Sequence, residues 1–166
     1  MEDPVAAALA RLSKAQAKCA KELLELTASH ADSPAWASAG IAAVVRLCHD
    51  PAAAADAVAV LGCLSEADDA NDDLIREAGA FPSLVALLTG GPASDVVTKA
   101  AGALANLTCN DANQVPIIEA GAIAPLVALL SGGPDSAAAE GAAGALRNLT
   151  CHGEGRTAII EAGAIP

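Results

Sequence analysis

Six acidic side chains lie within twelve residues of one another, and carboxylate oxygens are ligands that Ca²⁺ prefers. A twelve-residue calcium loop that began at Asp69 would need glycine at its sixth position and glutamate at its twelfth. The sequence has Leu74 and Ala80 there. We therefore predict no metal site, and we expect a solvated turn that enters a helix whose positive end favours acidic residues. The six residues are Glu66, Asp68, Asp69, Asp72, Asp73 and Glu77.

The histidines and cysteines give little support to nucleophilic catalysis or to zinc binding. Cys151 and His152 are neighbours, but Cys109, at the same position of an internal repeat, is followed by Asn110. The cysteines form no Cys-x-x-Cys pair, and we expect reduced thiols that act as small buried apolar groups. We predict no catalytic residue and no cofactor. The residues concerned are His30, His49, His152, Cys19, Cys48, Cys63, Cys109 and Cys151.

An internal sequence repeat predicts the arrangement of the secondary-structure elements that would position any functional side chain. The triplet Glu-Ala-Gly begins at residues 77, 119 and 161, a constant spacing of 42 residues. Residues 77–118 and 119–160, aligned without gaps, are identical at 24 of 42 positions. A more diverged copy begins at Ser38-Ala39-Gly40, and Trp36 is expected in the core of its first helix. A period of this length is typical of a solenoid of stacked units.

Each unit is predicted to contain three helices. In the best-defined copy the first helix covers residues 111–120, with Asn110 or Asp111 as its cap and Gly121 as its stop. The second helix covers residues 123–130.

The third helix begins at a cap on Ser136 and runs to Thr150. Small residues at 143–145 would let neighbouring helices approach closely, and Leu146 and Leu149 would supply its larger core contacts. A unit of this size cannot bury its apolar faces alone, so we expect it to stack on its neighbours.

Residues 1–32 differ from the repeats and are predicted to hold an amphipathic helix that caps the stack. Asp3 and Pro4 supply its start. One stripe of this helix is apolar except at Gln16, and a second face is basic. The basic face is either a solvated surface or a docking site for an anion. The stripe is Val5, Leu9, Leu12, Gln16, Cys19, Leu23 and Leu26, and the basic residues are Arg11, Lys14, Lys18 and Lys21.

Composition narrows the fold class and the choice of partner. Apolar residues make up 54% of the chain, yet only Trp36 and Phe81 are aromatic, which favours closely packed helices over a β-sandwich. The net charge is −11, so nucleic acid and anionic membranes are poor partners. A basic or apolar partner fits better. The sequence shows neither a secretory signal nor a membrane-spanning run, and we expect a cytoplasmic location, with the nucleus also open.

The third-helix motifs resemble those of the armadillo repeat family. They are Gly-Ala-Leu-Ala-Asn-Leu-Thr at residues 102–108 and Gly-Ala-Leu-Arg-Asn-Leu-Thr at 144–150. The motif sequences are more similar to those of plant-type and protist armadillo proteins. The resemblance implies an all-α fold, a right-handed α-α superhelix that forms an armadillo solenoid of about three repeats after the capping helix. The repeats would cover approximately residues 33–67, 68–110 and 111–152, with a truncated last repeat at 153–166.

The same resemblance implies a concave groove, lined by the third helices, in which the motif asparagine binds the backbone of an extended peptide. That role falls on Asn106 and Asn148, although each could instead bond a neighbouring loop and hold the stack together. Import adaptors of the family carry tryptophan where this chain has Gly102 and Gly144, which disfavours recognition of a basic import signal. The predicted partner-groove residues are Lys99, Gly102, Asn106, Gly144, Arg147 and Asn148, with Gly141 on the same face.

Two functions follow from the resemblance. The first is a non-enzymatic scaffold that binds a protein or an extended peptide in the groove. The alternative is the substrate-recruiting part of a ubiquitin ligase of the U-box and armadillo type, whose catalytic module would lie outside this chain. The last residues, 163–166, match the start of a second helix, so we expect an uncovered apolar end that favours self-association.

Overall fold

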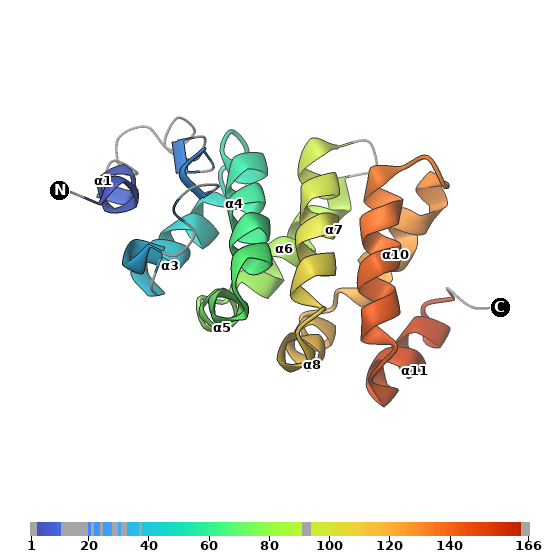
Figure 1. Ribbon diagram of the computed structural model, residues 1–166. Helices are drawn as coiled ribbons and strands as arrows, with labels where there is room; N and C mark the ends of the chain where they lie inside the picture. The colour runs from blue at the N-terminus through green and yellow to red at the C-terminus, as the bar shows by residue number, and fades with distance from the viewer. Residues whose placement is uncertain are drawn as a thin grey trace. The chain divides into compact units, whose positions relative to one another are not determined.

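The computed structural model describes residues 3–10, 20, 22–23, 25–27, 30, 33–36, 38–90 and 94–163 (Figure 1). The chain divides into two compact units, residues 1–83 and 84–166. The predicted basic face at Arg11, Lys14, Lys18 and Lys21 lies outside the described residues, as do residues 164–166 at the predicted uncovered end.

The first unit contains four α-helices and one 3-10 turn among its described residues. Helix α3 packs against α4 and α5, and the N-terminal α1 packs against α3 and the turn η1. Helix α6 begins in this unit and ends in the second. The elements are α1 (Pro4–Ala10), η1 (Pro34–Trp36), α3 (Ser38–Leu47), α4 (Ala54–Ala67), α5 (Asp69–Glu77) and α6 (Ala80–Leu87).

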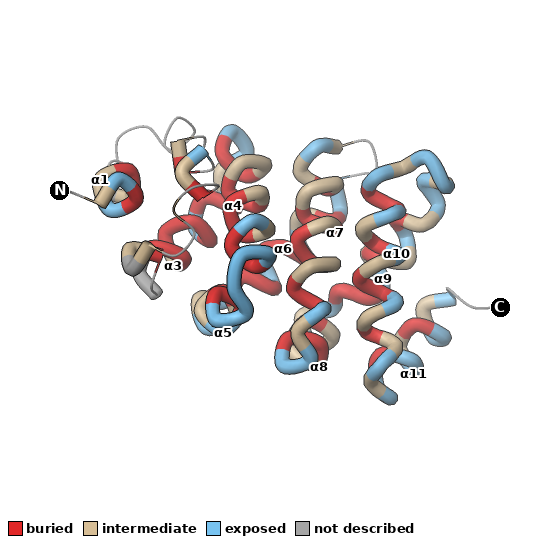
Figure 2. Tube along the Cα trace, viewed as in Figure 1, coloured by how far each residue is buried: buried red, intermediate tan, exposed pale blue. Residues whose placement is uncertain are grey.

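The second unit contains two third helices, α7 and α10, packed against each other. Helix α9 packs on α10, and α11 packs on α8 and α9. Along α7 and α10, buried stretches alternate with exposed or half-buried ones, as expected of helices with one core face (Figure 2). The elements are η2 (Leu88–Gly90), α7 (Asp95–Leu107), α8 (Asp111–Glu119), α9 (Ile123–Leu129), η3 (Leu130–Gly132), α10 (Ala137–Leu149) and α11 (Gly153–Glu161).

The predicted caps and stops are confirmed. Asn110 accepts a hydrogen bond from the N–H of Ala112 and begins α8, and Ser136 accepts one from Ala139 and begins α10. Gly121 follows α8 with φ of +82°, a left-handed conformation that side chains with a Cβ rarely adopt. The equivalent glycines 79 and 163 also have positive φ, so the same stop recurs with the sequence period.

The start of the N-terminal helix is also confirmed. The carboxylate of Asp3 accepts hydrogen bonds from the N–H groups of Val5 and Ala6, at 2.8 and 3.4 Å, and so caps α1. The hydroxyl of Ser33 donates to the same carboxylate, and this bond is the main cause that holds the pKa of Asp3 below its ordinary value. Asp3 therefore joins α1 to the chain segment before η1.

Buried side-chain amides fill the elbows between α4 and α5 and between α7 and α8. The Nδ2 of Asn113 donates to the carbonyl of Leu107 at 3.0 Å, and the Nε2 of Gln114 donates to that of Thr108 at 3.0 Å. Both carbonyls belong to the end of α7, where the helix leaves them without an internal partner. In the first unit Asn71 donates in the same way to the carbonyl of Leu64.

The close approach of α7 and α10 depends on glycine. A Cβ added at Gly141 would lie 2.9 Å from the backbone carbon of Ala101 and 2.9 Å from the backbone nitrogen of Gly102. Atoms at that separation overlap, so the two backbones touch where no side chain intervenes. At Gly144 an added Cβ would lie 3.5 Å from the Cβ of Ala105, an ordinary contact.

The diverged first copy differs from the pattern of the later ones. Gly40 lies inside α3 without positive φ, whereas its sequence equivalent Gly79 ends a helix. Trp36 is buried at 1% exposure, as expected, but it lies in the 3-10 turn η1 rather than in an α-helix. Its indole N–H donates to the carbonyl of His30, which satisfies the polar atom of the buried ring.

The expectation of a fully solvated acidic turn is wrong at one residue. Asp68 is exposed and caps α5 through the N–H of Ala70, but Asp72 is only 2% exposed. Asp72 is the repeat equivalent of Gln114 and lies one turn into its helix, at a position that the elbow buries.

The expectation of buried cysteines is confirmed only for Cys48, among the four cysteines that the structure describes. Cys63, Cys109 and Cys151 are exposed, because they lie on or beyond the solvent-facing sides of third helices. Burial raises the pKa of the Cys48 thiol to about 12.

Within the described residues, no single helix is long and apolar enough to span a bilayer. Helices α8 and α9 reach that length only together, and the chain bends by 92° between them.

Replacement of Gly141 and Gly102 by alanine should have opposite effects on stability. We expect Gly141→Ala to lower the free energy of unfolding by about 1 to 3 kcal/mol, since the added methyl group overlaps the backbone of α7. Gly102 is the matched control, because a Cβ there meets no described atom within 4 Å. Gly102→Ala should raise stability by about 0.5 to 1 kcal/mol through helix propensity. Urea unfolding curves that move by equal amounts in the same direction would contradict this account.

The cysteines should react at very different rates in the folded protein. Near pH 8 the thiol of Cys48 stays protonated because its pKa is about 12, and it is buried, so a maleimide should not label it until denaturant is added. The thiols of Cys63, Cys109 and Cys151 should be labelled without denaturant. Peptide mapping by mass spectrometry assigns each labelled site. Labelling of Cys48 as fast as Cys109 would show that the Cys48 thiol is not buried in the folded protein.

Candidate partner groove

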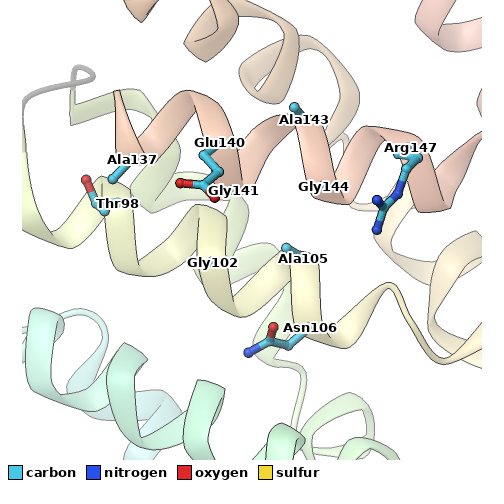
Figure 3. A pocket seen from close by; sticks show the side chains of 10 residues that line it. All are labelled: Thr98, Gly102, Ala105, Asn106, Ala137, Glu140, Gly141, Ala143, Gly144 and Arg147. Atoms are coloured by element: carbon cyan, nitrogen blue, oxygen red, sulfur yellow. The ribbon is translucent and has the colours of Figure 1, made fainter. Parts of the chain in front are cut away.

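An open groove of about 650 Å³ lies between α7 and α10, wholly within the second unit (Figure 3). Its floor consists largely of small residues, above all Gly102, Gly141 and Gly144, and the two helix backbones touch at Gly141. Its lining covers about two and a half turns of α7 and about three turns of α10. The lining residues are Thr98, Gly102, Ala105 and Asn106 from α7, and Ala137, Glu140, Gly141, Ala143, Gly144 and Arg147 from α10.

The structure brings most of the predicted groove residues to this one surface. Gly102, Asn106, Gly144 and Arg147 line it, together with Gly141. Lys99 and Asn148 are not among the lining residues. Lys99 forms an ion pair with Asp95 on its own helix, with its Nζ 2.6 Å from the carboxylate.

Asn148 is engaged in the contact between the two third helices. Its Nδ2 lies 3.3 Å from the carbonyl oxygen of Ala105 and 3.2 Å from the hydroxyl of Thr108, with the sulfur of Cys109 at 3.5 Å. The hydroxyl of Thr108 also donates to the carbonyl of Ala105. The amide nitrogen of Asn148 therefore has the stacking role that the sequence left open, and its role in binding a partner stays a prediction.

Glu140 is the groove residue that sequence reasoning missed. It is exposed on α10 and lies one turn before Gly144 and two turns before Arg147. Its spacing from these two predicted residues, four and seven positions, already placed it on their face of the helix.

The groove lining contains two ionisable side chains, one acidic and one basic. It holds no histidine or cysteine, and its ionisable side chains, Glu140 and Arg147, are exposed rather than desolvated. Across the described part of the chain, no group of three His, Cys, Asp or Glu side chains is placed to hold a metal ion. What the arrangement offers is a long, shallow contact surface with hydrogen-bonding and charged groups.

Comparison with models of known protein families identifies the family of this chain. The sequence profile of the armadillo/beta-catenin-like repeat matches residues 68–109 and 110–151, which together make up half of the chain. The chain belongs to the armadillo repeat family. No curated protein sequence matches it closely.

Solved structures of the armadillo class superimpose on nearly the whole chain. An engineered protein from the Northeast Structural Genomics Consortium matches 98% of it, and 69% of the engineered chain, with a TM-score of 0.86 and 28% identity. The designed armadillo repeat protein YIII(Dq)4CqI matches 96%, and 71% of its own chain, with a TM-score of 0.80 and 25% identity. These similarities confirm the predicted all-α armadillo solenoid.

One similar structure contains a ligand. It is a designed armadillo repeat protein in complex with the peptide (KR)4, and it matches 96% of this chain and 70% of its own, with a TM-score of 0.79 and 25% identity. A further set of designed armadillo repeat proteins was made for modular peptide recognition.

Removal of the Asn148 amide should weaken the contact between the two third helices. We expect Asn148→Ala to lower the free energy of unfolding by about 0.5 to 1.5 kcal/mol, the usual net value of such a hydrogen-bonded group. Arg147→Ala is the control on the same turn, because the Arg147 side chain is exposed, and its effect should stay within about 0.5 kcal/mol. Equal stability of Asn148→Ala and the wild-type protein in urea would remove the stacking role.

Proposed function

We propose that this armadillo protein is a non-enzymatic scaffold that binds an extended peptide segment of a partner protein in the groove between α7 and α10. The observation that carries the proposal is the groove itself, which has an open, glycine-lined floor and hydrogen-bonding or charged groups at both ends. An extended chain can lie close to such a floor because no bulky side chain covers the helix backbones.

The similar structures support this proposal. Designed armadillo repeat proteins bind peptides, and one of them holds (KR)4. The groove of this chain contains the motif asparagine Asn106, half-buried at one end of the lining. An asparagine side chain has both a donor and an acceptor, which matches the N–H and C=O of a peptide backbone.

The ubiquitin-ligase alternative gains no support from the matched residues or from the similar structures. A cytoplasmic or nuclear location fits the proposed scaffold, and it stays an expectation from the sequence.

A bulky side chain at Gly102 should weaken peptide binding strongly without disturbing the fold. An added Cβ at this position meets no described atom within 4 Å, so Gly102→Gln fills the groove rather than the core. A phage library of random dodecapeptides selected against the wild-type protein should yield peptides whose affinity falls about tenfold or more in this variant, a loss of roughly 1.4 kcal/mol.

The matched control is Ala128→Gln, which places the same side chain at an exposed position of α9 outside the groove lining. It should leave the affinity unchanged. Circular dichroism checks that both variants stay folded. A library that yields no binding peptide, or peptides that bind Gly102→Gln as tightly as wild type, would refute groove binding.

A further inference from the structure

Two charged side chains, Glu140 and Arg147, line the groove. Glu140 and Arg147 are both exposed, and neither forms an ion pair with any side chain that the structure describes. By contrast Lys99, on the facing helix, is already neutralised by Asp95. The charges that a ligand in the groove would meet are therefore one carboxylate and one guanidinium.

The two charges stand apart along one helix. Seven residues separate them, which is two turns of α10 and a rise of about 10 Å. Figure 3 shows both side chains on the side of α10 that faces α7, with Glu140 nearer Thr98 and Arg147 toward the end that carries Asn106. Because this separation exceeds the Debye length of about 8 Å at physiological salt, a ligand would experience each charge individually.

The local charge differs from that of the whole molecule. The chain carries a net charge of −11, which on its own favours a uniformly basic ligand such as (KR)4. The groove lining, however, holds one acidic and one basic side chain and is locally neutral. A uniformly basic peptide would place a cation against Arg147, and a uniformly acidic one would place an anion against Glu140.

We propose that the groove selects extended peptides of mixed charge, with a basic side chain at Glu140 and an acidic side chain at Arg147. The proposal rests on the proposed function, since it requires that a peptide occupies this groove. It makes Glu140 and Arg147 the residues that determine specificity, whereas Asn106 and the glycine floor accept any extended backbone.

A peptide of alternating lysine and glutamate meets this requirement in the extended polyproline II conformation. In a polyproline II conformation, side chains three residues apart lie on the same side at a spacing of about 9 Å. In the alternating sequence those two residues also carry opposite charges.

Three octapeptides of equal length test the proposal: alternating lysine and glutamate, alternating lysine and arginine, and alternating aspartate and glutamate. Binding is measured by fluorescence anisotropy at low salt and again at high salt. The wild-type protein should bind the mixed peptide about threefold to tenfold more tightly than either uniform peptide, as expected from two partly exposed ion pairs. High salt should remove the preference.

Charge variants should then change the ranking in a fixed way. Glu140→Lys should favour the acidic peptide, and Arg147→Glu should favour the basic one. The double exchange Glu140→Arg with Arg147→Glu keeps the net charge and should restore the preference for the mixed peptide. Glu119→Lys, at an exposed position of α8 outside the groove, alters net charge as Glu140→Lys does and should leave the wild-type ranking in place.

Preference of the wild-type protein for the lysine and arginine peptide would overturn the proposal, because net charge would then determine the choice. So would a ranking that the groove variants leave unchanged, or a failure of all three octapeptides to bind while library peptides still bind in a Gly102-dependent manner. In these cases the scaffold function survives. If no peptide binds, including those of the library, both the scaffold function and the mixed-charge specificity are refuted.

Discussion

The contact of two helix backbones at Gly141 determines most of what the second unit presents to solvent. With no side chain between α10 and the segment Ala101–Gly102 of α7, the two helices meet at a separation that any larger residue would increase. The register fixed at this point places Glu140, Gly144 and Arg147 beside one trough. The groove is therefore a by-product of tight packing: Gly141 lets the two helices touch, and Gly102 and Gly144 beside it leave the surface without bulky side chains.

That contact is supported at the ends of the helices by hydrogen bonds to carbonyls that the helices cannot satisfy themselves. Asn148 secures α10 to the last turn of α7, and Asn113 and Gln114 secure α8 to the same end. Each of these three side chains bonds a backbone carbonyl of the neighbouring helix end, and Asn148 also contacts the side chains of Thr108 and Cys109. Every repeat has a backbone carbonyl at the equivalent position. The same side-chain-to-carbonyl hydrogen bond can therefore form in another repeat when only the donor residue is present there.

Local sequence signals were sufficient to predict the framework of the fold. The cap at Ser136 and the stop at Gly121 depend on residues within one turn of the helix end, and both occur where expected. Burial and side-chain partners depend on neighbours distant in the sequence. The exposure of Cys109, the burial of Asp72 and the bond from Asn148 to Ala105 therefore required the structure. Glu140 was accessible from spacing alone, but a single charged residue on a helix gives no sign that a groove lies beside it.

One position in the elbow behind each third helix holds a chemically different side chain in each copy. The equivalent positions hold Asp72, Gln114 and Arg156, which carry a carboxyl group, an amide and a guanidinium group. Gln114 donates to a carbonyl of α7 from a buried position, whereas Arg156 reaches the carbonyl of Thr150 from an exposed one. Repeats that are similar in sequence therefore differ in the side chain that fills the elbow, and one repeat cannot simply replace another. A recombination event that shuffled them would move an ionised group into an elbow shaped for an amide, and this limits how the array can lengthen by duplication.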